Sequence, residues 1–127
     1  DLMAPGLHGS TFGGNPVCTA AALAVLRVLA ADDLVERADV LGKTLSHGIE
    51  SLGHPLVDHV RGRGLLRGVV LTAPQGKAVE TAARDAGFLV NAAAPDVIRL
   101  APPLIITEAQ IDSFLTALPA ILDEAVA

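Results

Sequence analysis

The spacing of apolar residues changes near Leu56, and the change limits the folds open to this chain. Up to about residue 52 they recur every three or four positions, which is the helical period. From Leu56 onward short runs that alternate, as is typical of strands, are interspersed with two further segments of helical spacing. Because the links between successive strands are short, the strands should pair antiparallel. The sequence therefore predicts an α+β domain, a small antiparallel sheet covered by helices in two layers.

Capping and turn residues bound the individual elements. Asn15 and Pro16 suit the start of a helix, and Thr107 suits the cap of the last one. We expect helices over residues 16–30, 34–51, 76–86 and from 108 onward, and strands over residues 56–61, 65–72, 88–91 and 97–100. Pro102-Pro103 should bar further pairing at that edge of the sheet.

The first expected helix is apolar on nearly every side, with Val17, Leu23 and Leu26 among its residues. Such a helix is normally buried on most of its surface. Half of the 127 residues (51%) are hydrophobic, so some apolar residues should face a partner rather than an internal core. We expect two parts: residues 1–31, a loop and connecting helix that pack on a large domain outside this chain, and residues 32–127, a small α+β domain.

Composition excludes several classes of partner. The net charge is -5 and the nine basic residues are scattered, which argues against nucleic-acid binding.

The single Cys18 rules out an internal disulfide framework and is expected to be a small core residue. The first residues show no signal-peptide pattern, and the longest apolar run contains Arg27 and falls short of the about 20 residues of a membrane span. We expect a soluble, cytoplasmic protein that binds neither nucleic acid nor membrane.

Two hydroxyls, Ser10 and Thr11, precede the glycine turn Gly13-Gly14 that leads into the first helix. Hydroxyls, accessible backbone amides and the positive end of a helix together suit a phosphate group. Alternatively, the two side chains only satisfy local backbone groups at a capped helix start. The residues alone leave both interpretations open.

Arg99 stands at the end of an apolar strand, where a buried guanidinium would need a carboxylate or phosphate partner. A structural ion pair, or a side chain that extends to solvent, would explain it equally well. Arg61 and Arg63 alternate with glycines, which usually mark a bend between strands, and a phosphate-binding role for either is the weaker interpretation.

The remaining reactive residues form no recognisable site. His47, His54 and His59 lack the spacing of metal ligands, so we expect no metal. Lys43 and Lys77 lie where a helix should be exposed, and neither is expected to form a covalent bond to a carbonyl group.

Three segments, taken in order, resemble the class III aminotransferases, which use pyridoxal 5'-phosphate. They are His8-Gly9-Ser10-Thr11-Phe12-Gly13-Gly14-Asn15-Pro16, Arg61-Gly62-Arg63-Gly64-Leu65 and Ile98-Arg99-Leu100-Ala101-Pro102-Pro103-Leu104. The resemblance spans nearly the whole chain. Within the class it is greatest to the members that act on acetylornithine, through Ser10-Thr11-Phe12 and the segment 102–107.

The resemblance implies the small C-terminal domain of a fold-type I enzyme that works as a homodimer. Thr11 would bind the cofactor phosphate in the active site of the opposite subunit, and Ser10 would contact acetylornithine from the same loop. Arg99 would receive the α-carboxylate of N-acetylornithine and of 2-oxoglutarate. The implied reaction moves the δ-amino group of N-acetylornithine to 2-oxoglutarate, giving glutamate, in arginine biosynthesis. The lysine that carries the cofactor should lie upstream of Asp1, so this chain alone is expected to be inactive and to hold no catalytic residue.

Other functions fit parts of the pattern. A non-catalytic small-molecule-binding module would share the order of strands and helices but would not need the hydroxyl-bearing glycine turn. An oligomerisation domain is favoured only by the aliphatic surface. Related ornithine, succinylornithine and γ-aminobutyrate transaminases share the class, and the residues that separate them are expected mostly upstream.

Overall fold

The computed structural model describes residues 9–127, so His8 of the first motif lies outside the described residues. The chain divides into two compact units, Asp1–Asp33 and Leu34–Ala127. The first contains helix α1 (Pro16–Ala31). Its start is the predicted one: the Asn15 side chain accepts hydrogen bonds from the amides of Val17 and Cys18, and Pro16 is the first helical residue.

No residue of α1 is buried within this chain, although its apolar pattern is typical of a buried helix. Val17 is 77% exposed and Leu26 61% exposed, and Cys18 is an exposed thiol rather than a core residue. The described part of the first unit supplies no second helix or strand against which α1 could pack. The apolar surface of α1 is therefore uncovered within its own unit.

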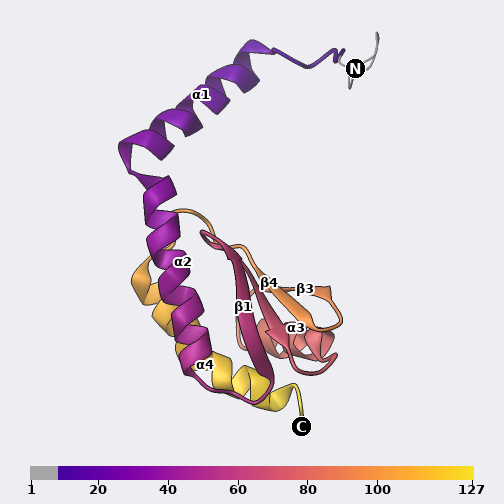
Figure 1. Ribbon diagram of the computed structural model, residues 1–127. Helices are drawn as coiled ribbons and strands as arrows, with labels where there is room; N and C mark the ends of the chain where they lie inside the picture. Colours follow the sequence, from indigo (N-terminus) through magenta and orange to yellow (C-terminus); the bar gives the residue numbers. More distant parts are fainter. Residues whose placement is uncertain (1–8) are drawn as a thin grey trace, which may run out of the picture. The chain divides into compact units, whose positions relative to one another are not determined.

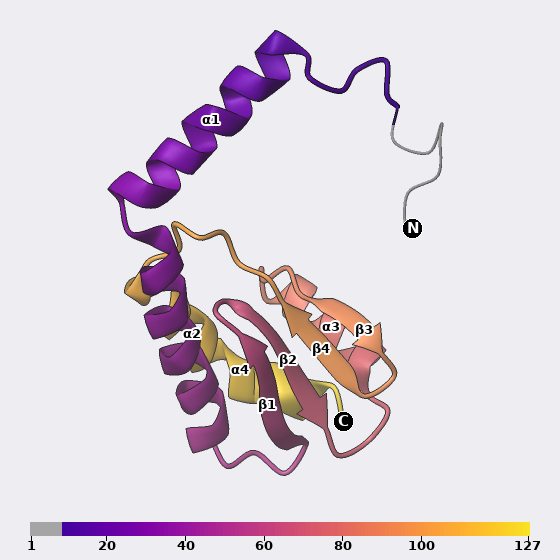
Figure 2. The same cartoon turned by 45° about the horizontal axis from the view of Figure 1, so that its top comes forward.

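The second unit is the α+β domain that the change of period predicts. In chain order it contains α2 (Leu34–Ser51), β1 (Val57–Arg63), β2 (Leu66–Leu71), α3 (Gly76–Asp85), β3 (Asn91–Ala94), β4 (Val97–Leu100) and α4 (Glu108–Glu124). The strands form one antiparallel sheet in the order β1-β2-β4-β3. Figures 1 and 2 show α3 and α4 on one side of this sheet, with α2 beside β1. No element of Leu34–Ala127 covers the other side, which we call the open face.

The hydrophobic core lies between the sheet and its helices. Each layer contributes residues that are at most 4% exposed, including Ile49 from α2, Val69 from β2, Ile98 from β4 and Ile111 and Leu122 from α4. These are the apolar positions expected from the helical and alternating patterns. Burying such aliphatic side chains stabilises a domain by about 1.5–3 kcal/mol each.

Two details of the sheet differ from the sequence expectation. Strand β3 begins at Asn91 rather than Phe88, because the Phe88 amide donates to the Ala83 carbonyl and completes the end of α3. The Phe88 ring then packs edge-on against Phe114.

The second difference concerns β4, which lies between β2 and β3 and is therefore not an edge strand. Pro102-Pro103 ends this central strand instead of protecting an edge. Within residues 9–127, no helix is long and apolar enough to cross a membrane.

Candidate functional site

The turn before α1 engages one of its two hydroxyls locally. Ser10 Oγ accepts a hydrogen bond from the Gly13 amide at 3.2 Å, and the Asn15 amide donates to the Phe12 carbonyl. Gly14 has a φ of 76°, a conformation that favours glycine. A side chain on Gly14 would meet no atom within 4 Å, so the backbone of this turn is accessible from outside.

Thr11 contrasts with Ser10. It is exposed, and its hydroxyl has no hydrogen-bond partner among the residues that the structure describes. The first backbone amides of α1 are less available to a ligand than the Thr11 hydroxyl, because those of Val17 and Cys18 already donate to the Asn15 side chain. Of the features expected to hold a phosphate, the Thr11 hydroxyl and the open glycine turn remain available, and the end of the helix is already capped.

The strand register places Arg99 on the open face. Its neighbours Ile98 and Leu100 are buried on the helix side, and successive side chains of a strand point to opposite faces. Arg99 is exposed, which agrees with the alternative of a side chain that extends to solvent. No hydrogen bond or ion pair joins it to any described residue, so the structural ion pair considered from sequence is not formed within this domain.

Gly68 is a feature of this face that the sequence interpretation did not single out. The register aligns Arg61 of β1, Gly68 of β2 and Arg99 of β4 in one row across three strands. A glycine inside a strand often marks the close approach of another group, and this was the available signal.

Of the two other arginines of this region, Arg67 has hydrogen-bond partners within the domain. Arg67 donates from Nε to the Gly64 carbonyl at 2.8 Å and from Nη1 to the Gly62 carbonyl at 3.0 Å, which holds the turn of the β1–β2 hairpin. A hydrogen bond and the charge of Lys43, with smaller contributions from Arg63 and Arg67, hold the pKa of the Asp39 carboxyl below its usual value. The positive charges of Arg63 and Arg67 therefore help to stabilise the ionised Asp39 carboxylate.

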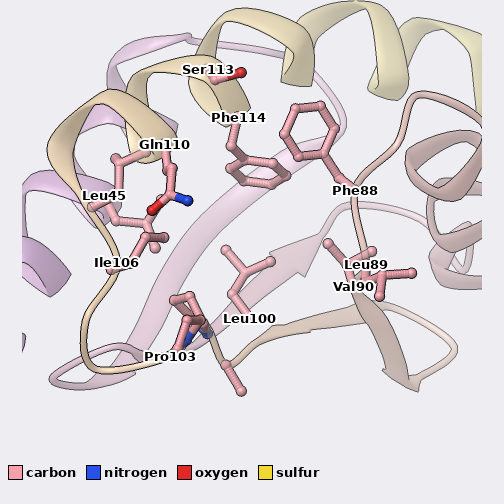
Figure 3. A pocket seen from close by; sticks show the side chains of 13 residues that line it. Leu45, Phe88, Leu89, Val90, Leu100, Pro103, Ile106, Gln110, Ser113 and Phe114 are labelled. Carbon is pink, nitrogen blue, oxygen red and sulfur yellow. The ribbon is translucent and has the colours of Figure 1, made fainter.

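The domain also contains an apolar pocket of about 320 Å³, which Figure 3 shows. It is lined mainly by Leu45, Phe88, Leu89, Val90, Leu100, Ala101, Pro102, Pro103, Ile106, Gln110, Ile111, Ser113 and Phe114. Its polar groups belong to Gln110 and Ser113, neither of which is ionisable. Gln110 also forms the capping box of α4 with Thr107. None of Ser10, Thr11 and Arg99 lines this pocket, so it is not the predicted site.

Both lysines of the domain are exposed and paired with a carboxylate, unlike the desolvated lysines that form covalent bonds to carbonyl groups. Lys43 pairs with Asp39 at 2.6 Å and is 72% exposed, and Lys77 pairs with Glu80 and is 81% exposed. Within residues 9–127, no three His, Cys, Asp or Glu side chains cluster as metal ligands would.

One face of the antiparallel sheet carries helices and the other carries an arginine, and a hydroxyl-bearing glycine turn precedes a separate helix. These features suit one part of a larger cofactor-dependent transferase. Comparisons with known proteins agree. The family model described as aminotransferase class-III matches residues 1–122. This chain belongs to the class III aminotransferases.

Individual relatives are close in sequence. The chain is 81% identical over 125 residues to an acetylornithine aminotransferase of Mycolicibacterium smegmatis, covering 98% of this chain and 32% of the relative. It is 56% identical over 125 residues to an acetylornithine aminotransferase of Streptomyces coelicolor, covering 98% of this chain and 31% of that protein. The chain thus spans about a third of the length of the curated relatives that it matches.

Solved structures confirm the fold class. The crystal structure of acetylornithine aminotransferase from Elizabethkingia anophelis matches with a TM-score of 0.86 and 38% identity, over 98% of this chain and 34% of that one. An amine transaminase from an uncultivated Pseudomonas species, in its PLP-bound form, matches with a TM-score of 0.85 and 32% identity. The match covers 94% of this chain and 30% of that one. The α+β domain is therefore that of a fold-type I PLP-dependent transaminase.

Proposed function

We propose that this chain is the C-terminal part of an acetylornithine aminotransferase, which transfers the δ-amino group of N-acetylornithine to 2-oxoglutarate in arginine biosynthesis. The observation that carries the proposal is identity of 75–81% with acetylornithine aminotransferases of several mycobacteria across 98% or more of the chain. The exposed Arg99 on the open face of the sheet supports it.

The role of Arg99 is to bind the α-carboxylate of both substrates. A guanidinium stays protonated and offers two parallel N–H donors that match a carboxylate. Arg99 already projects from the sheet without an internal partner in the described chain. Binding by Arg99 would set the distance between the carboxylate and the reacting amino or keto group, because strand β4 fixes the arginine backbone between two neighbouring strands.

The role of Thr11 is to donate a hydrogen bond to the phosphate of pyridoxal 5'-phosphate in the opposite subunit of a homodimer. Its hydroxyl is not used locally, and the neighbouring glycine turn leaves room for a phosphate to approach. Ser10 would contact acetylornithine from the same loop. Without a bound ligand, however, Ser10 Oγ accepts a hydrogen bond from the Gly13 amide. Ser10 would therefore also shape the turn that presents Thr11.

Pyridoxal 5'-phosphate, when bound, supplies the electron sink that the amino transfer requires. The residues of this chain would position groups and would not themselves react. Thr11 would anchor the phosphate, and Arg99 would orient the substrate carboxylate. Residues 1–31 would pack on the large domain of the parent, which would cover the exposed apolar residues of α1, and residues 32–127 would form the small domain. The parent enzyme would be cytoplasmic, and this chain alone would be inactive.

The decisive experiment compares amino donors. The full-length parent enzyme should be assayed with 2-oxoglutarate and, separately, N-acetylornithine, N-succinylornithine, ornithine and γ-aminobutyrate. We expect the highest kcat/KM for N-acetylornithine. An ornithine aminotransferase from Plasmodium falciparum also matches the fold, with a TM-score of 0.85 and 29% identity, so ornithine is the most informative competitor. A preference for another donor would refute the substrate assignment but not the reaction type.

A further inference from the structure

Arg61 has a position that the proposed function does not explain. Like Arg99 it is exposed, and among residues 9–127 no hydrogen bond or ion pair involves its side chain. The neighbouring Arg67 holds the hairpin carbonyls, and Arg63 lies near enough to Asp39 to lower the pKa of its carboxyl. Among residues 9–127 Arg61 thus has neither a hydrogen-bond nor an ion-pair partner, and the strand register places it in one row with Gly68 and Arg99.

The Arg61 side chain lies beside Gly68. A Cβ placed on Gly68 would be in van der Waals contact with Val97 Cγ1 at 3.4 Å and with Cγ and Nε of Arg61 at 3.6 and 3.8 Å. The side chain of Arg61 therefore leaves β1 and extends over β2, where a side chain longer than one carbon on Gly68 would meet it. Gly68 is paired on its other side with Arg99, and directly paired residues of neighbouring strands project from the same face.

The spacing of the strands allows the two arginines to bind one shared anion. Neighbouring strands lie about 4.8 Å apart, so an Arg61 side chain that extends over β2 lies about one strand spacing from β4, which carries Arg99. Two N–H donors that bind the same oxygen, each at about 2.8 Å, stand roughly 4.8 Å apart when they approach at about 120°. A carboxylate can accept several such bonds, because its two oxygens offer about four lone-pair sites.

The charges of the two arginines also favour a bound anion. Two like charges on one face repel each other, and no carboxylate of the described chain pairs with either. A bound anion would remove the repulsion and gain charge-assisted hydrogen bonds from both sides. The chain as a whole is acidic, with a net charge of -5, so this basic row is a local feature and not the consequence of a basic protein.

Resting on the proposed function, we propose that Arg61 and Arg99 bind the same substrate carboxylate, with Gly68 providing the space in which Arg61 reaches it. The ligand class is an α-keto or α-amino acid whose carboxylate lies over the open face of the sheet. Arg61 is then a substrate-binding residue of the transaminase, and it acts on substrate affinity rather than on the transfer of the amino group.

The test measures binding of glutarate, a dicarboxylate that has no keto or amino group, to the full-length parent holoenzyme by calorimetry. Arg61→Gln should weaken glutarate binding about tenfold, because a charged hydrogen-bond donor is lost. Arg61→Lys should restore part of the affinity. Arg84→Gln is the matched control: Arg84 is an exposed arginine in the last turn of α3, on the helix side of the sheet, and its removal should leave glutarate affinity unchanged.

A double-variant cycle shows whether the carboxylate is shared. If Arg61 and Arg99 bind one group, Arg61→Gln combined with Arg99→Gln should lose clearly less affinity than the product of the two single losses. Multiplicative losses would overturn the proposal, as would Arg61→Gln binding glutarate like the parent. A lower Tm of Arg61→Gln with unchanged glutarate affinity would show that Arg61 stabilises the fold instead of binding the substrate, and would also overturn it. The measurement needs no amino donor, so a wrong donor assignment would not affect its outcome.

Discussion

Gly42 of α2 packs directly against Gly64 in the turn of the β1–β2 hairpin. A Cβ on Gly42 would stand 1.8 Å from the Gly64 carbonyl oxygen, far inside any allowed contact. Gly64 itself has a φ of 53°, and its carbonyl also accepts the hydrogen bond from Arg67. The helix and the hairpin can approach this closely only because Gly42 carries no side chain at the contact, whereas the positive φ of Gly64 favours glycine there.

Gly42→Ala should destabilise the domain. Relief of the clash requires a backbone shift, which typically costs about 1–3 kcal/mol, against about 1 kcal/mol gained from the higher helix propensity of alanine. We expect a net loss of up to about 2 kcal/mol in the free energy of unfolding, measured by urea denaturation.

Gly48→Ala is the matched control in the same helix. Its Cβ would meet the methyl groups of Leu115, which can move by a change of rotamer. The free energy of unfolding should therefore change less for Gly48→Ala than for Gly42→Ala. The reverse order would contradict the packing argument.

Glu80 gives the domain a sensitivity to acid. A hydrogen bond from Lys77 is the largest influence that lowers the pKa of its carboxyl from 4.5, followed by the charge of Lys77 and smaller hydrogen bonds from Ala92 and Asn91, while burial opposes them. Because the pKa is lower in the folded state, the stabilisation is present above about pH 4.5. It is lost as the pH falls through the lower folded value.

Glu80→Gln should remove this dependence. The difference in the free energy of unfolding between the unmodified chain and Glu80→Gln should shrink between pH 4.5 and pH 3. Lys77→Met should reduce the acid sensitivity as well, because it removes the principal cause of the shift. Parallel stability curves for the unmodified chain and Glu80→Gln over this range would refute the assignment.

The regular elements could be predicted from sequence because each depends on local periodicity and capping. The core positions Leu41 and Leu45 of α2, and Leu118 of α4, follow from helical spacing alone. Strand β3 was misplaced by three residues at its start because Phe88 is apolar in either role. Only the hydrogen bond to Ala83 shows that its amide belongs to the end of α3.

The candidate site was predicted less completely, because it depends on which strands become neighbours. Arg99 could be selected from its own surroundings in the sequence. The row formed by Arg61, Gly68 and Arg99 could not, since it requires β2 to lie between β1 and β4. Short links favour pairing within each hairpin, but the order of strands across α3 is set by packing of the whole domain.

This chain alone should not retain pyridoxal 5'-phosphate. The ammonium groups of Lys43 and Lys77 are paired with Asp39 and Glu80, and a charged amine is not a nucleophile. After incubation with the cofactor and dialysis, no absorbance band of a protein adduct should remain. A band that persists, and that disappears in Lys43→Met or Lys77→Met, would contradict this expectation.

Thr11 and Ser10 should differ in their effect on the cofactor in the parent homodimer. Thr11→Val keeps the shape of the side chain but removes the hydroxyl that has no local partner in the described turn. We expect the dissociation constant for pyridoxal 5'-phosphate to rise about tenfold, the usual cost of one hydrogen bond to a charged group.

Ser10→Ala removes instead an acceptor for the Gly13 amide, so it should affect the cofactor only through the shape of the turn. The cofactor affinity should fall by less than about threefold, and the KM for the amino donor should rise. Fluorescence titration of the apoenzyme with pyridoxal 5'-phosphate measures the first quantity, and steady-state kinetics measures the second. Equal losses of cofactor affinity in both variants would mean that the turn acts as a unit and that Thr11 has no separate contact with the phosphate.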